Sequence, residues 1–457
     1  MNKKNNNVDA MSVFSKWVDE YLNFERTPVK NIFWLDTMFY LCKKFSNPQD
    51  SFKSFHVAGS KGKGSVSVMI ASILEAAGFP SGLYTSPHLI NFSERIGTVK
   101  GNLSEAVYEK SVSSVMNGVN SILDDELPAK RPVTWFELVT LLSFVCFKNA
   151  GFQYAVYETG LGGRLDATNV LSPVCCCINT IELEHTEFLG NTLEKIAFEK
   201  AGIIKPGVPV IVAPQKESVK EVFRKAAEEK NAPVFFADEC GFVKINDFSF
   251  DGMKICLTSN LFSRPLNVKL KLLGDFQATN ALIASIAVKT VLPDIREDII
   301  EEGLSNASLS GRFEIIKSPD AYKNLPYLIL DGAHTVNSIQ DTLSNLNKVF
   351  PSNKNFHLLF ACAYDKNVES ISSLFKNKFS HIILTKPGDV KECDIERCKN
   401  AFDENELHYI SCSDYYRAIS LALHDADEEN AVLLVTGSFY LVAEVKKYLL
   451  SKLCVSN

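Results

Sequence analysis

Apolar runs of strand length alternate with amphipathic segments of helix length along most of the chain. Up to about residue 240, helices are predicted from residue 63, over 134–150 and over 193–201, and buried strands are predicted at "FKSFHVAG", "SGLYTS", "FQYAVYETG", "VCCCINTI" and "VPVIVAP". Apolar strands that alternate with helices are typical of a parallel sheet covered on both faces. The pattern therefore predicts an α/β domain in this part.

The pattern changes between residues 241 and 274, where apolar and polar positions alternate with period two. This alternation predicts a small antiparallel β element. Helices are predicted over 276–291 and 295–305, and small polar residues in "NASLSGRFEII" then indicate a domain boundary near residue 310. Beyond it, "YLILDGA", "FHLLFACA", "HIILTKP" and "AVLLVTGS" predict a smaller, Rossmann-like α/β domain. We therefore expect domains of residues 1–310 and 311–457.

Composition narrows the class of protein. The 457 residues are 46% hydrophobic and 22% charged, which suits two or three packed domains. The formal net charge is −6 and no Lys/Arg block is present, so neither nucleic acid nor an anionic membrane is expected as the main partner. The first ten residues, "MNKKNNNVDA", have no apolar core, and no uncharged apolar run reaches 18 residues. We expect a cytoplasmic enzyme.

The twelve cysteines do not indicate a disulfide scaffold. They are sparse, no Cys-x-x-Cys spacing occurs, and Cys175–Cys177 lie in an apolar run of strand length. We expect reduced thiols that pack as small hydrophobic side chains.

The segment "HVAGSKGKGSVSV" is the first candidate for chemistry. It lies between a predicted strand and a predicted helix, where backbone N–H groups and a helix N-terminus bind phosphate. It departs from the strict P-loop pattern, because Val57 replaces the leading glycine and Gly64 occupies the position after Lys63, with Ser65 one residue late. Read alone, it is either a phosphate loop or a glycine-rich turn with two surface lysines.

Acidic residues and a histidine follow two further predicted strands. Glu158 ends one strand ahead of the glycine turn in "YETGLGGRLDATNV", and His185 follows the next strand among several glutamates. Ligands of open α/β sheets bind at the carboxyl ends of the strands, so Glu158 and His185 are candidate cation ligands. The alternatives are a solvated carboxylate and a surface histidine.

Taken together, these segments resemble the folylpolyglutamate synthase and dihydrofolate synthase family of the Mur ligase superfamily. The shared motifs include "HVAGSKGKGS", "SPHL", "TWFE", "ETGLGGRLDATN", "EHTEFLG", "EKAGIIKPG", "GDFQATNA", "GRFE", "DGAH" and "GSFY". The resemblance runs from about residue 21 to 448. Because the loop of this family reads Gly-x-x-Gly-Lys-Gly-Ser/Thr, the late hydroxyl of Ser65 fits the resemblance.

The resemblance implies a fold and a role for single residues. It implies a P-loop-type ATPase domain with a small antiparallel β element, followed by the Rossmann-like domain. It implies that ATP is bound by Gly59, Gly62, Lys63, Gly64, Ser65, Asn280, Arg312, Asp331 and His334. It implies that two Mg²⁺ ions are held by Ser86, Glu158 and His185. It implies contacts to the pterin-bearing substrate from Thr134, Trp135, Phe136, Glu137, Leu165, Asp166 and Ala167.

Catalysis is implied for Lys63, His185 and Lys200, of which Lys200 matches a lysine that the family carboxylates on its ε-nitrogen. The carbamate would make Lys200 an anion able to face Mg²⁺, and the alternative is an ordinary surface lysine at a helix C-terminus. Three departures from the family pattern stand out: Glu184 replaces Asp, Thr335-Val336 replaces Asn-Pro, and "ACAYDKN" is a loose version of a Gly-x-x-x-Asp-Lys-Asp segment.

The implied reaction is phosphoryl transfer from ATP to a substrate carboxylate, followed by attack of L-glutamate on the acyl phosphate. Closure of the second domain over ATP would shield that intermediate from water. One alternative is a Mur-type ligase of cell-wall precursors, although only about 55 residues precede the loop. Another is a nucleotide-binding protein without ligase activity. The sequence leaves open whether folate, dihydropteroate or both are substrates, and the family favours a monomer.

Overall fold

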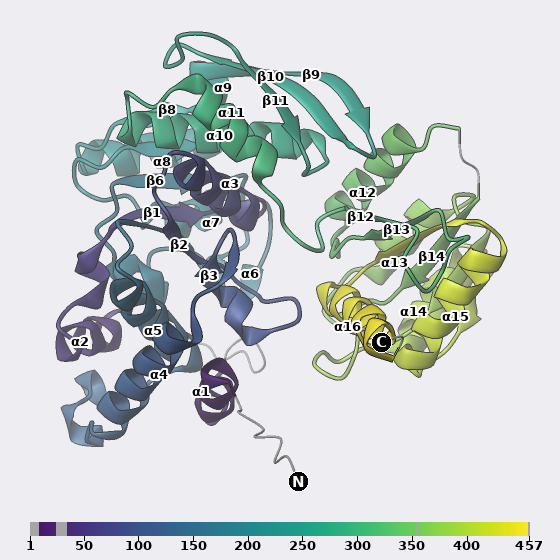
Figure 1. Ribbon diagram of the computed structural model, residues 1–457, viewed down its shortest axis with the longest axis horizontal. Helices are drawn as coiled ribbons and strands as arrows, with labels where there is room; N and C mark the ends of the chain where they lie inside the picture. The colour runs from purple at the N-terminus through teal and green to yellow at the C-terminus, as the bar shows by residue number, and fades with distance from the viewer. Residues whose placement is uncertain (1–8, 24–33, 353–354, 456–457) are drawn as a thin grey trace. The chain divides into compact units, whose positions relative to one another are not determined.

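The computed structural model describes residues 9–23, 34–352 and 355–455, so most of the polar N-terminal stretch lies outside the described residues (Figure 1). The chain divides into two compact units. The first comprises Met1–Ile245, Ile255–Leu270 and Phe276–Ala307, and the second comprises Asn246–Lys254, Lys271–Asp275 and Ser308–Asn457.

The first unit is built on an eight-stranded sheet of order β4-β3-β2-β5-β1-β6-β7-β8. The six strands from β2 to β8 in this order run parallel, whereas β3 and β4 pair antiparallel at one edge. The predicted parallel sheet is therefore present. Its strands are β1 (Lys53–Ala58), β2 (Ser81–Tyr84), β3 (Ile96–Thr98), β4 (Gly101–Asn102), β5 (Tyr154–Glu158), β6 (Cys175–Ile178), β7 (Val210–Val212) and β8 (Val234–Phe236).

Helices cover both faces of this sheet (Figure 1). Helix α3 packs against β1, β2 and β5, while α5 packs on the opposite face against Tyr84, Ala155 and Tyr157. Helices α7 and α8 cover β6 and β7 around Phe223. The helices are α1 (Ala10–Val18), α2 (Asp36–Lys44), α3 (Lys63–Ala76), α4 (Glu105–Asn120), α5 (Trp135–Ala150), α6 (Thr186–Leu189), α7 (Leu193–Ala201), α8 (Glu217–Glu229), α9 (Ala237–Cys240), α10 (Asp275–Val291) and α11 (Glu297–Asn306).

The period-two segment forms a separate three-stranded sheet of β9 (Gly241–Ser249), β10 (Gly252–Ser259) and β11 (Leu266–Leu270). Only Phe250 and Asp251 connect β9 to β10, a hairpin connection that joins antiparallel strands. The turn of this hairpin, Asn246–Lys254, belongs to the second unit. There Phe250 packs on Tyr327, with ring centroids 5.6 Å apart.

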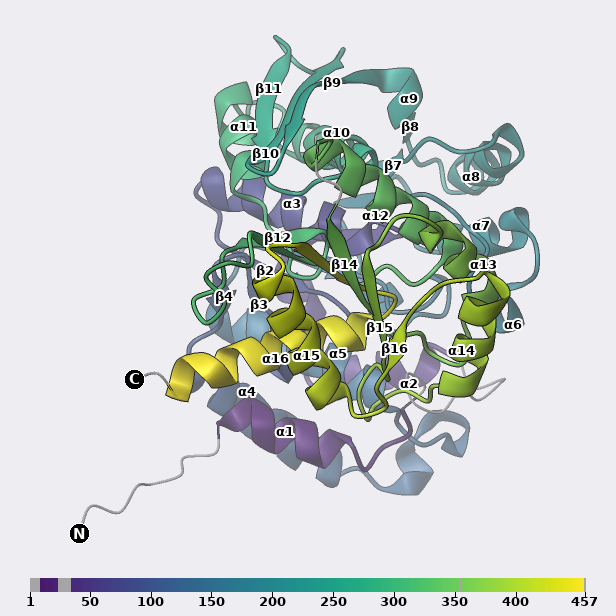
Figure 2. The same ribbon diagram turned by 90° about the vertical axis from the view of Figure 1, so that its right-hand side faces the viewer.

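The second unit has a six-stranded sheet of order β12-β13-β17-β14-β15-β16, in which only β12 is antiparallel to its neighbour. Helices α12, α13 and α14 lie on one side of it, and α15 and α16 lie on the other (Figure 2). Both sheets confirm the predicted α/β class. The elements are β12 (Glu314–Lys317), β13 (Tyr327–Leu330), β14 (Phe356–Phe360), β15 (His381–Leu384), β16 (Ile410–Ser411), β17 (Val432–Thr436), α12 (Val336–Val349), α13 (Val368–Ser372), α14 (Ile395–Glu404), α15 (Tyr415–Glu428) and α16 (Phe439–Val455).

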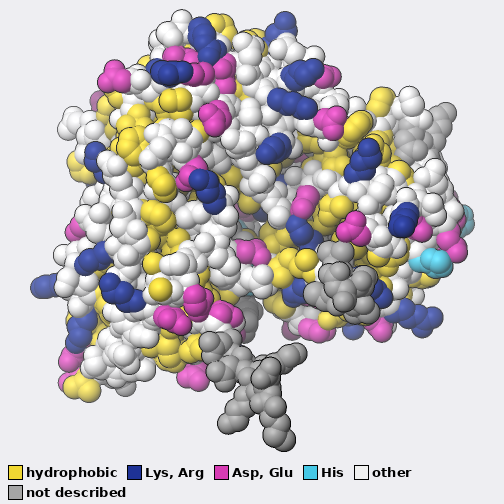
Figure 3. Space-filling view, viewed as in Figure 1, with side chains coloured by type: hydrophobic (Ala, Val, Ile, Leu, Met, Phe, Trp, Pro, Cys, Tyr) yellow, Lys and Arg dark blue, Asp and Glu magenta, His cyan; other side chains and the backbone are white. Residues whose placement is uncertain are grey.

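The surface carries charges of both signs. On the face drawn in Figure 3, basic and acidic side chains are interspersed rather than gathered into a block of one sign. Within the described ranges, no helix combines the length and the apolar character needed to cross a bilayer. The eleven cysteines that the structure describes are all free thiols, and Cys175–Cys177 are buried in β6 as expected of small core residues.

Candidate active site

The candidate residues of the first unit gather at one edge of its sheet. Strands β2, β5, β1 and β6 are neighbours in that order and run parallel, so the segments that follow them meet at their carboxyl ends. Those segments carry Ser86, Glu158, the loop 59–65 and Asn179. The strand order thus brings together residues that lie more than 100 positions apart in the sequence.

The loop after β1 needs glycine at two positions. Gly59 has a φ of +144° and Gly62 a φ of +78°, both in the region that side chains with a Cβ rarely adopt. A Cβ on Gly59 would lie 2.5 Å from the Cβ of Asn179, and one on Gly62 would lie 2.5 Å from its Nδ2. The loop therefore passes directly over Asn179, a residue that the motifs of the sequence did not single out.

This loop leads directly into the first turn of helix α3. Gly62 is the N-cap residue, Lys63 and Gly64 follow, and Ser65 is 3% exposed. The first amides of a helix have no acceptor within the helix and carry a partial positive charge. From α10, the Oδ1 of Asn280 accepts a hydrogen bond of 2.9 Å from Asn179 beside Gly62. The first turn of α3 is therefore a candidate anion site, with Asn280 at its side.

Two lysines donate to one carbonyl oxygen in this loop. The Nζ atoms of Lys63 and Lys200 lie 3.1 and 2.9 Å from the oxygen of Gly59. Lys200 also donates to Oε1 of Glu184 at 3.0 Å and is 1% exposed, which rules out an ordinary surface lysine. Burial, with a contribution from the charge of Lys63, lowers the pKa of Lys200 to about 8 despite the opposing effect of Glu184.

Glu184 is the carboxylate that balances these lysines. Burial alone would raise its pKa, but the charges of Lys63 and Lys200 outweigh that effect and lower the pKa of Glu184 below its ordinary value. Glu184 is therefore ionised at neutral pH. The replacement of the family's Asp by Glu keeps a negative charge at this position.

The predicted metal ligands occupy two places. Glu158 ends β5, is 5% exposed, and accepts a hydrogen bond of 3.1 Å from the backbone N–H of Ser86. A freely solvated carboxylate is thus excluded for Glu158. His185 is exposed at the N-cap of α6, with a φ of +46°, and its charge helps to lower the pKa of Glu184. The described contacts therefore link Ser86 to Glu158, and His185 to the surroundings of Glu184.

In the "TWFE" segment, three side chains have structural contacts. The hydroxyl of Thr134 donates to Glu137 at 2.8 Å in a capping box of α5, and Arg131 forms an ion pair with Glu137. Trp135 is 3% exposed and donates from Nε1 to Asp19 at 3.1 Å. Phe136 is only partly buried, and its ring fills the space beside Gly160.

Asp166 shapes the glycine turn that follows Glu158. Its Oδ2 accepts hydrogen bonds of 2.9 Å from the N–H groups of both Gly160 and Leu161, and its Oδ1 accepts one of 3.0 Å from Thr168. Burial raises the pKa of Asp166, although these hydrogen bonds oppose the shift. Neighbouring Ala167 is buried and Leu165 is half-buried.

In the second unit, Asp331 follows β13 and is held at two points. Its Oδ2 accepts from Thr342 at 2.7 Å, and its Oδ1 accepts from the N–H of Ala333 at 3.2 Å. Burial raises the pKa of Asp331, against the lowering effect of Arg312. The guanidinium of Arg312 stacks on Phe439 at 4.7 Å from the ring centroid.

His334 and Thr335 stand at the start of α12. The Nδ1 of His334 lies 2.8 Å from the carbonyl oxygen of Gly332. Thr335 is the N-cap residue of α12, and its side chain accepts from the N–H of Ser338. The Thr335-Val336 pair therefore keeps a capped helix start where the family pattern has Asn-Pro.

Comparisons with known proteins identify the family of the chain. Residues 57–288 match the Mur ligase middle domain, and residues 311–439 match the Mur ligase glutamate ligase domain. The probable dihydrofolate synthetase of Schizosaccharomyces pombe is 32% identical, over 91% of this chain and 98% of the relative. The dihydrofolate synthase/folylpolyglutamate synthase of Bacillus subtilis is 29% identical, over 95% of this chain and 97% of the relative. The crystal structure of Thermotoga maritima folylpolyglutamate synthase superposes with a TM-score of 0.82 at 28% identity, covering 97% of both chains.

Proposed function

Because the chain belongs to the folylpolyglutamate and dihydrofolate synthases of the Mur ligase family, we propose that it joins L-glutamate to the carboxylate of a folate or of dihydropteroate. It is an ATP-dependent, amide-forming ligase. A Mur-type ligase of cell-wall precursors is not supported, since the relatives that match over nine tenths of the chain are folate enzymes.

One observation carries the proposal: an anion site and two carboxylates meet at a single edge of the sheet. The anion site is the first turn of α3 with Lys63, and the carboxylates are Glu158 and Glu184. A nucleotide triphosphate with its divalent cation needs both kinds of group at once. A glycine turn with two surface lysines would need neither the buried Glu158 nor the buried Lys200.

The reaction proceeds in two steps. A carboxylate oxygen of the folate substrate attacks the γ-phosphorus of ATP, the bond to ADP breaks, and an acyl phosphate forms. The amine of L-glutamate then attacks the acyl carbon, loses a proton, and expels inorganic phosphate to leave an amide. Lys63 and the amides of α3 would hold the transferring phosphoryl group, mainly through position and charge.

The oxygens of Ser86 and Glu158 fit Mg²⁺, which prefers carboxylate and hydroxyl ligands, and His185 would complete the set. Glu158 is buried at the end of β5, beside the strand that leads into the loop of Gly59 and Gly62, and would provide negative charge for the ion. When bound, as two ions, Mg²⁺ would neutralise charge on the phosphates.

Lys200 is suited to carboxylation. With a pKa of about 8, roughly one amine in ten is uncharged at pH 7, compared with about one in three thousand for an ordinary lysine. The uncharged amine adds to carbon dioxide, forms an N–C bond and releases a proton, which leaves a carbamate anion. We propose that this anion supports the second metal position beside Glu184.

The remaining roles are also proposals. Phe136 and Leu165, the half-buried members of their segments, would contact the pterin, while Thr134, Trp135, Glu137, Asp166 and Ala167 would hold the walls of that site. Asn280, Arg312, Asp331 and His334 would contact the nucleotide. Domains of residues 1–310 and 311–457 would then divide the work, with the phosphate loop in the first domain.

Folate and dihydropteroate are both candidate substrates, because one relative is named for both activities and another for dihydrofolate synthesis alone. The test supplies purified protein with ATP, Mg²⁺ and glutamate, and either dihydropteroate or tetrahydrofolate. Products are read by mass. A gain of one glutamyl group identifies the substrate, and no new amide with either would refute the proposal. We further propose a monomer in the cytoplasm, where free thiols such as Cys176 persist.

A further inference from the structure

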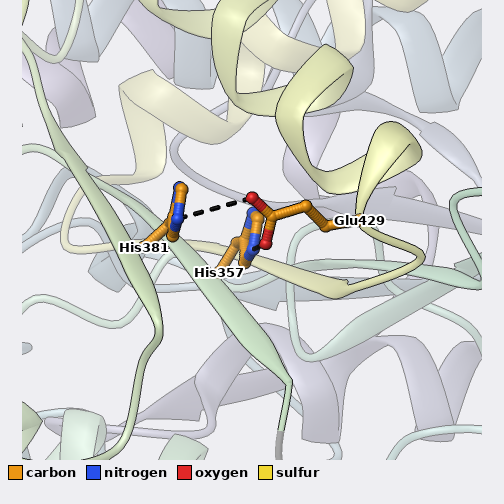
Figure 4. Close-up of side chains that lie close together, drawn as sticks. All are labelled: His357, His381 and Glu429. Atoms are coloured by element: carbon orange, nitrogen blue, oxygen red, sulfur yellow. Dashed lines mark hydrogen bonds and ion pairs between the residues drawn. The ribbon is translucent and has the colours of Figure 1, made fainter.

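Two histidines of the second unit stand side by side on neighbouring strands. His357 of β14 and His381 of β15 are direct partners in the parallel register. Their rings stack at 4.7 Å between centroids, with 7° between the planes. Glu429, the C-cap residue of α15, reaches both of them from the end of that helix (Figure 4).

The three side chains bring their ligand atoms close together. Oε2 of Glu429 lies 3.2 Å from Nε2 of His357, and Oε1 lies 3.4 Å from Nε2 of His381. All three ligand atoms fall within 4.8 Å of one another, and the described part of the chain contains no other such group of three His, Cys, Asp or Glu side chains. From these residues, we propose that the second unit binds a transition-metal ion, with Zn²⁺ as the best match.

The distances support this coordination. Zinc bonds to nitrogen and oxygen of about 2.0–2.2 Å place tetrahedral ligand atoms about 3.3–3.5 Å apart. Both nitrogen–oxygen separations to Glu429 are close to that length already. To bind one ion, the two parallel imidazole rings must turn toward each other. His381 can make this rotation because its side chain is 44% exposed, whereas that of His357 is 3% exposed. Water can take the fourth position from the exposed side.

The chemistry of the ligands selects the metal. Two imidazoles and one carboxylate suit Zn²⁺ or a neighbouring transition metal, whereas Mg²⁺ prefers oxygen ligands. The ring of His357 is buried, and its Nε2 faces the carboxylate of Glu429 at 3.2 Å, so that a metal bound between the two would meet both ligands. The carboxylate of Asp425 acts on His357 as well and adds negative charge to the surroundings.

The backbone around the cluster is held in place. The side chain of Asn355 donates to the carbonyl oxygen of Glu429 at 3.1 Å and accepts from the hydroxyl of Ser380 at 2.8 Å. The N–H of Ser380 donates to the carbonyl oxygen of Phe356 at 2.9 Å. Asn355 thus ties together the residues that precede both histidines and the residue Glu429 itself. Such support is what a preorganised metal site requires.

This site lies away from the nucleotide residues of the second unit. His357 and His381 are near the amino ends of their strands, whereas Asp331 follows the carboxyl end of β13, which runs in the same direction. A strand of four to five residues separates the two edges by about 13–17 Å. The metal would therefore act on the stability of the unit by joining β14, β15 and α15, rather than on the reaction.

The test is zinc binding to the full chain, measured by competition with a chromophoric chelator. Mg²⁺ and a non-hydrolysable ATP analogue are present so that the first unit's site is occupied. His381→Gln and Glu429→Gln change exposed ligands and should each weaken binding at least about tenfold. The matched control is His424→Gln, which alters an exposed His424–Glu428 pair at 3.2 Å outside the cluster and should leave zinc affinity unchanged.

Cobalt provides the second measurement. Tetrahedral Co²⁺ bound by the cluster should give an intense visible absorption in the wild type and in His424→Gln, and this band should disappear in His381→Gln. Circular dichroism of each variant verifies folding. Equal zinc affinity of the wild type and His381→Gln, or wild-type binding weaker than about 10 μM, would overturn the proposal, because three ligands this close should bind more tightly.

Discussion

Replacing Lys200 by Met should stabilise the protein while removing its activity. The pKa of Lys200 falls from 10.5 to about 8 on folding, chiefly through burial, and each pKa unit corresponds to about 1.4 kcal/mol. Since the folded-state pKa is the lower one, the protonated amine opposes folding by about 3 kcal/mol below pH 8. That penalty declines as the pH rises from 8 to 10.5. Methionine has a similar length and no charge.

We therefore expect Lys200→Met to raise the free energy of unfolding by about 2–3 kcal/mol at pH 7, and by about 1 kcal/mol at pH 9.5. Guanidinium denaturation followed by circular dichroism measures both values, in buffer free of carbon dioxide and Mg²⁺ so that the lysine is unmodified. The control is Lys195→Met on the same helix, an exposed site where the change should stay within about 0.5 kcal/mol. A less stable Lys200→Met at pH 7, or an equal gain at both pH values, would refute the reasoning.

Three other changes test the site. Gly62→Ala forces a Cβ at φ +78° and 2.5 Å from Asn179, so stability should fall by about 1–3 kcal/mol and the KM for ATP should rise; an unchanged KM would contradict the loop assignment. Glu158→Gln keeps the size but removes the charge, and should raise the Mg²⁺ concentration for half-maximal rate by about tenfold or more, which a Mg²⁺ titration measures. Arg312→Ala should lower turnover at least about tenfold without unfolding, as steady-state kinetics and circular dichroism would show, whereas unchanged kcat would exclude a nucleotide role.

Strong local patterns made much of the fold predictable. Strands β1, β5 and β14 are apolar runs that lie buried in the sheets, and the helix expected over 193–201 is α7. The hydrophobic pattern did not predict the short edge strands, and the reason is physical. Strands β3 and β4 have three and two residues at a sheet edge, and so bury too few side chains to leave a period in the sequence.

The site was predictable where motifs follow strand ends, and less so where side chains meet through the fold. Thr134 and Glu137 have the spacing of a capping box, which local sequence reveals, but the partner Arg131 depends on the path of the preceding loop. The only sequence signal for Asn179 was its position directly after the apolar residues of a predicted strand. His357 and His381 are 24 positions apart, and only the order β17-β14-β15 places them together.

The hairpin turn that belongs to the second unit limits how this protein can exchange parts with its relatives. Recombination at a single junction near Ala307 would join one parent's C-terminal segment to the other parent's Asn246–Lys254 and Lys271–Asp275. In such a chimera, Phe250 of one parent would pack against the other parent's residue at the position of Tyr327. The ion pair of 2.7 Å between Asp275 and Lys348 would also be formed by residues from two different parents. A viable chimera must therefore take all three segments from the same parent. The second unit can be exchanged between relatives only if its three separate stretches of sequence are exchanged together.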